Sequence, residues 1–167
     1  MRNKRVMFIV QAAVIAALYV VLTYVANALG LASYSIQVRF SEALCVLPCF
    51  TPAAIPGLWI GCLIANLTTG AIIWDIIFGS LATLIGATFT YLLRNQNKFL
   101  GPVPPILSNT IIVPFVLRYG YGVNLPIPFL MLTVGIGEVI SCGVLGMIIY
   151  HALKRYKGTL FTLPGAN

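Results

Sequence analysis

Residues 6–26 read "VMFIVQAAVIAALYVVLTYVA" and contain no charged side chain. A run of about 20 apolar residues is what a helix needs to cross a bilayer. The whole chain of 167 residues is 60% hydrophobic and 8% charged, whereas soluble domains average about 45–50% apolar and about 25% charged residues. The sequence therefore predicts an all-α integral membrane protein.

Basic residues flank the apolar runs. Eight of the ten Lys and Arg side chains fall within residues 2–5, 94–98 and 154–157. Such clusters orient membrane helices and do not form the basic stripe of a nucleic-acid-binding protein. The first cluster also resembles the start of a cleaved signal peptide, but the apolar run that follows exceeds the usual length of about 7–15 residues. We therefore expect a multi-pass protein of the bacterial cell membrane, with its first helix retained and no nucleic-acid partner.

We expect six transmembrane helices with both termini in the cytoplasm. Basic clusters at both ends of the chain require an even number of crossings, and the cluster at 94–98 requires an even number before it. The stretch 40–70, which prolines interrupt, must then cross twice, with a cytoplasmic turn near residues 48–56. A single transmembrane domain over residues 1–167 is predicted, with helices at about 6–27, 40–50, 53–70, 72–93, 102–119 and 127–151.

The second predicted helix is too short to cross the bilayer. Residues 40–50 would span about 16 Å as an α-helix, roughly half of the hydrocarbon core. The preceding segment 29–40 must therefore fold into the protein from the outer side, where irregular backbone is tolerated only if it is buried or lines a wet cavity. Arg39 and Glu42 are therefore expected to lie at the floor of an outward-facing cavity.

The chain has three acidic residues, and all of them fall on the outer side or at mid-depth. Charged side chains within spans are costly and mark functional sites by default. A structural alternative is an ion pair that joins Arg39 to Asp75 or to Glu42. Carboxylates, amides and aromatic faces together suit a flat heterocycle with hydrogen-bonding edges. The candidate substrate-binding residues are Glu138, Asn109, Glu42, Arg39, Asp75, Trp59, Tyr34 and Asn66.

We expect neither a metal site nor a cofactor. The four cysteines form no CxxC pair and His151 is the sole histidine, so convergent metal ligands are not seen. The chain also has no phosphate-binding GxxxxGK[ST] loop, no HExxH and no GxSxG motif. An enzyme is therefore not expected, and this chain does not hydrolyse ATP by such a loop.

Small residues recur at four-residue spacing in the first predicted helix, as Ala12 with Ala16 and Ala13 with Ala17. Stripes of small residues let helices approach closely in lipid. The two stripes therefore either pack inside the bundle or dock another membrane protein.

Four segments carry a family resemblance: "IQVRFSEALCVLPCFTPAAIPGLWIGCLIANL" (36–67), "WDIIFGSLATLIGA" (74–87), "NTIIVPFVLRYGYG" (109–122) and "GIGEVISCGVLG" (135–146). Together, over about residues 5–155, they resemble the QueT family. This family comprises substrate-binding S components of energy-coupling factor (ECF) transporters, associated with uptake of queuosine precursors.

The resemblance implies a six-helix fold in which a long first outer loop caps an outward-facing pocket, and it implies a 7-deazaguanine ligand such as preQ1, preQ0 or queuine. Glu138 would accept from the N1–H and the exocyclic amine of the guanine-like edge, Asn109 would read the carbonyl side, and Trp59 or an aromatic residue of the 29–40 loop would stack on the ring. The stripe Ala12, Ala13, Ala16 and Ala17 would dock on a membrane coupling subunit, and two partner ATPase subunits would hydrolyse ATP. A stand-alone secondary carrier, or a small integral-membrane enzyme, with Glu138 as proton relay remains the alternative.

Overall fold

The structure is a computed structural model that describes residues 3–31 and 38–161. Every regular element in this described part of the chain is a helix, which confirms the predicted all-α class. The predicted ligand contact Tyr34 lies outside the described residues. The elements are α1 (Lys4–Ala28), η1 (Phe40–Cys49), α2 (Ala54–Thr68), α3 (Ile73–Leu93), η2 (Lys98–Leu100), α4 (Val103–Phe115), η3 (Val116–Gly120), α5 (Ile127–Glu138), η4 (Val139–Leu145), α6 (Gly146–Lys154) and α7 (Lys157–Leu160).

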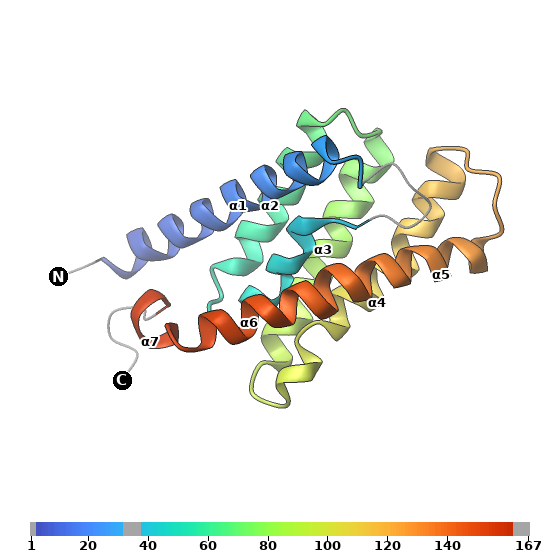
Figure 1. Ribbon diagram of the computed structural model, residues 1–167. Helices are drawn as coiled ribbons and strands as arrows, with labels where there is room; N and C mark the ends of the chain where they lie inside the picture. The colour runs from blue at the N-terminus through green and yellow to red at the C-terminus, as the bar shows by residue number, and fades with distance from the viewer. Residues whose placement is uncertain (1–2, 32–37, 162–167) are drawn as a thin grey trace.

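Four helical stretches of the described chain are long and apolar enough to cross a membrane. They are α1, α3, the stretch from η2 to η3, and the continuous rod of α5, η4 and α6, which runs along the whole bundle in Figure 1. Two shorter apolar helices, η1 and α2, fill the space between them. The number of crossings, six, remains a prediction, because length and composition alone do not place these short helices in a membrane.

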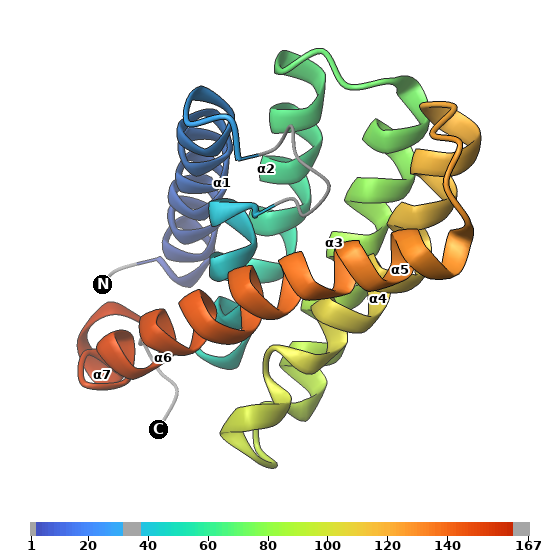
Figure 2. The ribbon, with the colours of Figure 1, turned by 45° about the vertical axis from the view of Figure 1, so that its right-hand side comes forward.

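The short helix η1 forms the centre of the bundle. It is a 3₁₀ helix with Pro48 inside it, and at about 2.0 Å per residue it is about 20 Å long. Every residue from Ser41 to Cys49 is buried, because η1 packs against α1, α2, α3, η4 and α6. Figure 2 shows this segment between α1 and the long rod. Arg39 at the N-cap of η1 and Glu42 in its first turn are thereby brought into the middle of the protein.

Helices α1 and α2 pack closely through small residues. A Cβ added to Gly57 would lie 2.8 Å from the carbonyl oxygen of Ala12, and one added to Gly61 would lie 3.0 Å from Cα of Ala16. The pair Ala12 and Ala16 therefore faces α2 inside the bundle. Ala13 and Ala17, on the neighbouring face of α1, are exposed.

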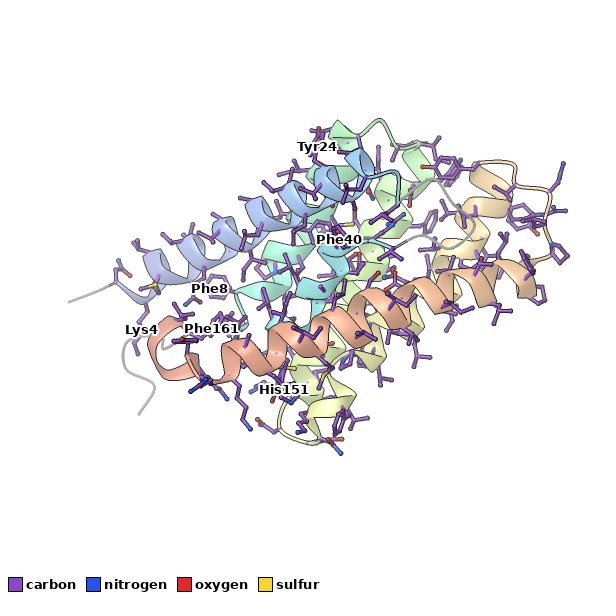
Figure 3. All side chains as sticks on the ribbon, viewed as in Figure 1. Lys4, Phe8, Tyr24, Phe40, His151 and Phe161 are labelled. Atoms are coloured by element: carbon purple, nitrogen blue, oxygen red, sulfur yellow. The ribbon has the colours of Figure 1, made fainter. Side chains whose placement is uncertain are left out.

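One end of the bundle holds both chain termini, as Figure 1 shows. Gln11 joins three elements there: its Oε1 accepts from Thr51 Oγ1 at 2.8 Å, and its Nε2 donates to the carbonyl of Leu160 at 3.0 Å. In Figure 3, Phe161 lies at this end and Tyr24 lies at the other. The N-terminal part of α1 and the C-terminal helix α7, both next to segments predicted to be cytoplasmic, thus lie at one end, and Tyr24, near the C-terminal end of α1, lies at the other.

Candidate substrate site

A cavity of about 440 Å³ opens at the end of the bundle opposite the chain termini. Its wall comes from the second half of α1, the start of η1, the end of α2, the start of α3, and the η3 helix with the loop that follows it. Polar and charged side chains form much of this wall, among them Thr23, Arg39, Asn66, Thr69, Asp75 and Tyr121. The cavity volume falls within the range of about 300–1,000 Å³ that is usual for small-molecule sites.

Asp75 supplies the carboxylate in this wall. It lies in the first turn of α3, where a helix N-terminus favours a negative charge. The hydroxyl of Tyr121 donates to its Oδ2 at 3.0 Å, while Oδ1 is buried without a hydrogen-bond partner in the described part of the chain. Partial burial, the Asp75 carboxylate and this hydrogen bond raise the pKa of Tyr121. The phenol therefore stays protonated and acts as a donor to Asp75.

Asn66 fixes the end of α2 against the start of α3. Its Nδ2 donates to the backbone carbonyl of Asp75 at 3.2 Å, and it also contacts Cys62 Sγ at 3.7 Å. Asn66 is buried and lines the cavity. The Nδ2 group of Asn66 thus holds the backbone of Asp75 in place. The amide oxygen of Asn66 is left as the atom that can accept a hydrogen bond from a ligand.

Arg39 brings a positive charge to the same wall. Its backbone N–H donates to Ser141 Oγ at 3.0 Å, which anchors the start of η1 to η4. Asp75 is its principal electrostatic neighbour, ahead of Tyr19 and Glu42. Among the residues that the structure describes, no ion pair within 4.0 Å joins Arg39 to a carboxylate. The predicted structural ion pairs are therefore not closed in this geometry.

Glu42 lies one layer below the cavity and is fully engaged by neighbours. Its Oε1 accepts from Tyr19 Oη at 2.5 Å, and its Oε2 accepts from Cys45 Sγ at 3.0 Å and Asn109 Nδ2 at 3.4 Å. It is 1% exposed and does not line the described wall of the cavity. Asn109 likewise lies in this lower layer, where its amide serves Glu42.

Glu138 belongs to the same lower layer, at the junction of α5 and the π-helix η4. Glu42, Arg39 and Asn109 are its electrostatic neighbours. Its Oε2 is buried and finds no hydrogen-bond partner among the described residues. The structure therefore brings Glu138, Glu42, Asn109 and Arg39 close to one another, and Glu138 is not among the residues that line the described cavity.

Trp59 lies away from this polar group. It is 39% exposed on α2 and does not line the cavity. Other aromatic side chains near the outer end are also exposed, notably Tyr119 and Trp74, as expected for an interfacial aromatic belt.

Sequence reasoning missed several residues of the site: the wall residues Thr23, Thr69 and Tyr121, and also Tyr19 and Ser141. Tyr19 both lines the cavity and holds Glu42, and Ser141 holds the Arg39 backbone. A signal for Tyr19 was present, because Ile15, Tyr19 and Ala26 recur at helical spacing on the buried face of α1. No comparable pattern singles out Ser141.

Comparison with known proteins places this chain in a family. The model of a family described as QueT transporter matches residues 9–155. The chain belongs to the QueT transporter family. It is also 34% identical over 98 residues to the queuosine precursor transporter QueT of Lactococcus lactis subsp. cremoris (strain MG1363), a match that covers 59% of this chain and 57% of that protein. No solved structure matches the chain.

Membership of the QueT family confirms the resemblance seen in the sequence. Together with the long apolar helices it establishes a multi-pass membrane protein. A family named for transport also agrees with the expectation that the chain is not an enzyme.

Proposed function

We propose that this QueT family member is the substrate-binding membrane subunit of an ATP-driven ECF-type importer, and that it takes up a 7-deazaguanine such as preQ1, preQ0 or queuine. The observation that carries the proposal is the cavity at the predicted outer end, whose wall combines Asp75, Arg39 and Asn66. These three side chains offer an acceptor, donors and an amide to the polar edge of a flat heterocycle. The curated relative, a queuosine precursor transporter, points to the same class of ligand.

The proposal assigns energy coupling to partner subunits. The sequence has no phosphate-binding loop, so a membrane coupling subunit and two ATPase subunits would supply ATP hydrolysis. The exposed face of α1 suits docking of the coupling subunit, because Ala13 and Ala17 leave room there for a helix to approach closely. Ala12 and Ala16, which the sequence also nominated, already contact α2, so the proposed docking face is restricted to Ala13 and Ala17.

A stand-alone carrier is the second candidate. It is favoured by one observation: Glu138 is a buried acid beside another acid, Glu42, and one of its oxygens has no hydrogen-bond partner among the described residues. Intramembrane acids of this kind serve as proton relays in carriers. Such a carrier would couple substrate entry to a proton gradient rather than to ATP.

Calorimetric titration of the purified chain tests the proposed ligand class. Guanine, preQ0, preQ1 and queuine are titrated separately into detergent-solubilised protein. We expect saturable binding of at least one 7-deazaguanine by the chain alone, with guanine binding more weakly. The absence of binding to all three 7-deazaguanines would contradict the proposal.

A further inference from the structure

Two opposite charges face the cavity without closing on one another. Asp75 in the first turn of α3 and Arg39 at the N-cap of η1 both line the wall. Each lies within electrostatic range of the other, but no ion pair within 4.0 Å joins them. Two charged groups in a sparsely hydrated site leave hydrogen-bonding capacity that a bridging ligand can satisfy.

The Asp75 carboxylate is held in place by its surroundings and is not saturated by them. Asp75 is 6% exposed. Its Oδ2 accepts from Tyr121, and its Oδ1 has no partner in the described chain. One helical turn later, Gly79 leaves room for the carboxylate, since a Cβ at that position would lie 2.8 Å from Oδ1. The carboxylate of this cavity-lining residue therefore holds one buried, unsatisfied acceptor oxygen in a fixed place.

Arg39 complements this acceptor with donors. Its backbone is tied to Ser141, and no hydrogen bond from its guanidinium to another described side chain is seen. A guanidinium carries five N–H donors in a planar fork. The fork and the carboxylate thus form a donor–acceptor pair that carries no net charge.

The other acids of the described chain are placed differently. Glu42 already accepts three hydrogen bonds, and Glu138 lies behind the cavity wall. A ligand that enters the cavity therefore meets one carboxylate, that of Asp75, and one guanidinium, that of Arg39. Their opposite polarity fits a ring edge that has a carbonyl acceptor next to N–H donors, and it disfavours an edge that has donors alone.

We propose that Asp75 and Arg39 read the carbonyl–amide–amine edge of a guanine-type base, with Arg39 donating to the carbonyl oxygen and Asp75 accepting from the ring N–H and the exocyclic amine. This assignment rests on the proposed function, and it names the residues that set ligand specificity. The part of the ligand that is read is thus a fused heterocycle with a 2-amino-4-oxo-pyrimidine ring. Glu42 and Glu138 are not among the residues that line the described cavity, and the assignment gives them no contact with this edge.

Three probes that differ only on this edge test the assignment. They are 7-deazaguanine, 7-deazahypoxanthine, which lacks the amine, and 7-deaza-2,6-diaminopurine, which replaces the carbonyl with a second amine and thereby turns ring N1 from a donor into an acceptor. Wild-type protein should bind 7-deazaguanine at least about tenfold more tightly than either of the others, because each charged hydrogen bond that is lost leaves a buried group unpaired. Affinities are measured by calorimetric titration of the purified chain.

Variants then connect each contact to one residue. Asp75→Asn should reduce the preference for 7-deazaguanine over 7-deazahypoxanthine to within about threefold, and Arg39→Met should weaken the preference over the diaminopurine, which keeps its mismatch between ring N1 and Asp75. Gly79→Ala should reduce the first preference as well, because its Cβ displaces Asp75 Oδ1. Two matched controls should keep both preferences: Arg94→Met at the exposed end of α3, and Gly143→Ala, where a Cβ would meet its nearest atom at 3.7 Å.

The outcomes separate this inference from the proposed function. If wild-type protein binds no 7-deazaguanine, the proposed function itself fails. If wild-type protein binds 7-deazaguanine and prefers it, but Asp75→Asn and Arg39→Met keep both preferences, the assignment of the edge is overturned. Thermal unfolding without ligand shows whether each variant is folded. If Asp75→Asn does not fold, Gly79→Ala decides: full retention of the preference over 7-deazahypoxanthine overturns the assignment of Asp75.

Discussion

The hydroxyl of Tyr19 donates to Oε1 of Glu42 at 2.5 Å, and both side chains are almost fully buried. The hydrogen bond ties the middle of α1 to the central helix η1, 23 residues later in the chain. A buried carboxyl that loses such a donor bears the desolvation penalty without compensation. This contact therefore stabilises the floor of the cavity.

Replacement of Tyr19 by Phe should lower the free energy of unfolding by about 1–3 kcal/mol, since it leaves Glu42 with an unsatisfied oxygen. Thermal unfolding of the ligand-free protein in detergent measures the effect. Tyr24→Phe on the same helix is the matched control, because Tyr24 is 46% exposed and should tolerate the change. Equal stability of the two variants would show that the Tyr19–Glu42 contact does not support the floor.

The two alanine pairs of α1 should respond differently to enlargement. Leu at Ala12 and Ala16 should destabilise the protein by roughly 1–3 kcal/mol through overpacking against α2, because their backbones lie close to Gly57 and Gly61. Leu at Ala13 and Ala17, which are exposed, should leave stability and ligand affinity unchanged and should abolish ATP-driven transport by blocking a partner helix. Thermal unfolding, calorimetry and uptake are compared for the two double variants. Normal uptake by the Ala13 and Ala17 variant would remove these residues from the docking face.

Sidedness can be measured with introduced cysteines. The four native cysteines are buried, so the background of labelling by a charged thiol reagent should be low. A cysteine at Asn97 should be labelled from the cytoplasmic side alone, and one at Asn124 from the external side alone; both positions are exposed. External labelling at Asn97 would contradict the topology with six crossings and both termini inside.

Glu138→Gln should change the affinity for 7-deazaguanine by less than about tenfold, because Glu138 is not among the residues that line the described cavity. The change also replaces a buried titratable carboxyl group next to Glu42 with a neutral amide, so the ligand-free protein should be at least as stable as the wild type. Calorimetry and thermal unfolding test both statements. A loss of about a hundredfold, or roughly 2.8 kcal/mol, would instead favour the direct role for Glu138 that the sequence alone predicted.

The helices themselves could be predicted from hydropathy, because each long apolar run has to satisfy its backbone internally in a bilayer. Prolines drew attention to the stretch 40–56, but they did not reveal that Phe40–Cys49 is a 3₁₀ helix buried along almost its full length. That conformation depends on the five elements packed around η1. Long-range packing of this kind leaves no local pattern in the sequence.

The sequence could predict which charged residues belong to the candidate site, but it could not predict which of them line the cavity. Charge rarity singled out Arg39, Glu42, Asp75 and Glu138, and the structure gathers them. Which acid faces the cavity depends on partners such as Tyr19 and Asn109, which satisfy Glu42 across the bundle. The sequence alone did not indicate which face of α2 carries Trp59. Gly57 and Gly61 pack against α1, and Trp59 lies on the opposite, exposed face of the helix.

Uptake into proteoliposomes is the most direct test of the central claim, that this chain binds a substrate whose import is driven by ATPase partners. The chain is reconstituted alone or with a coupling subunit and two ATPase subunits, and uptake of a radiolabelled 7-deazaguanine is followed with ATP or with an imposed proton gradient. We expect uptake only when the full module and ATP are present. Uptake by the chain alone under a proton gradient would contradict the claim and would identify a secondary carrier.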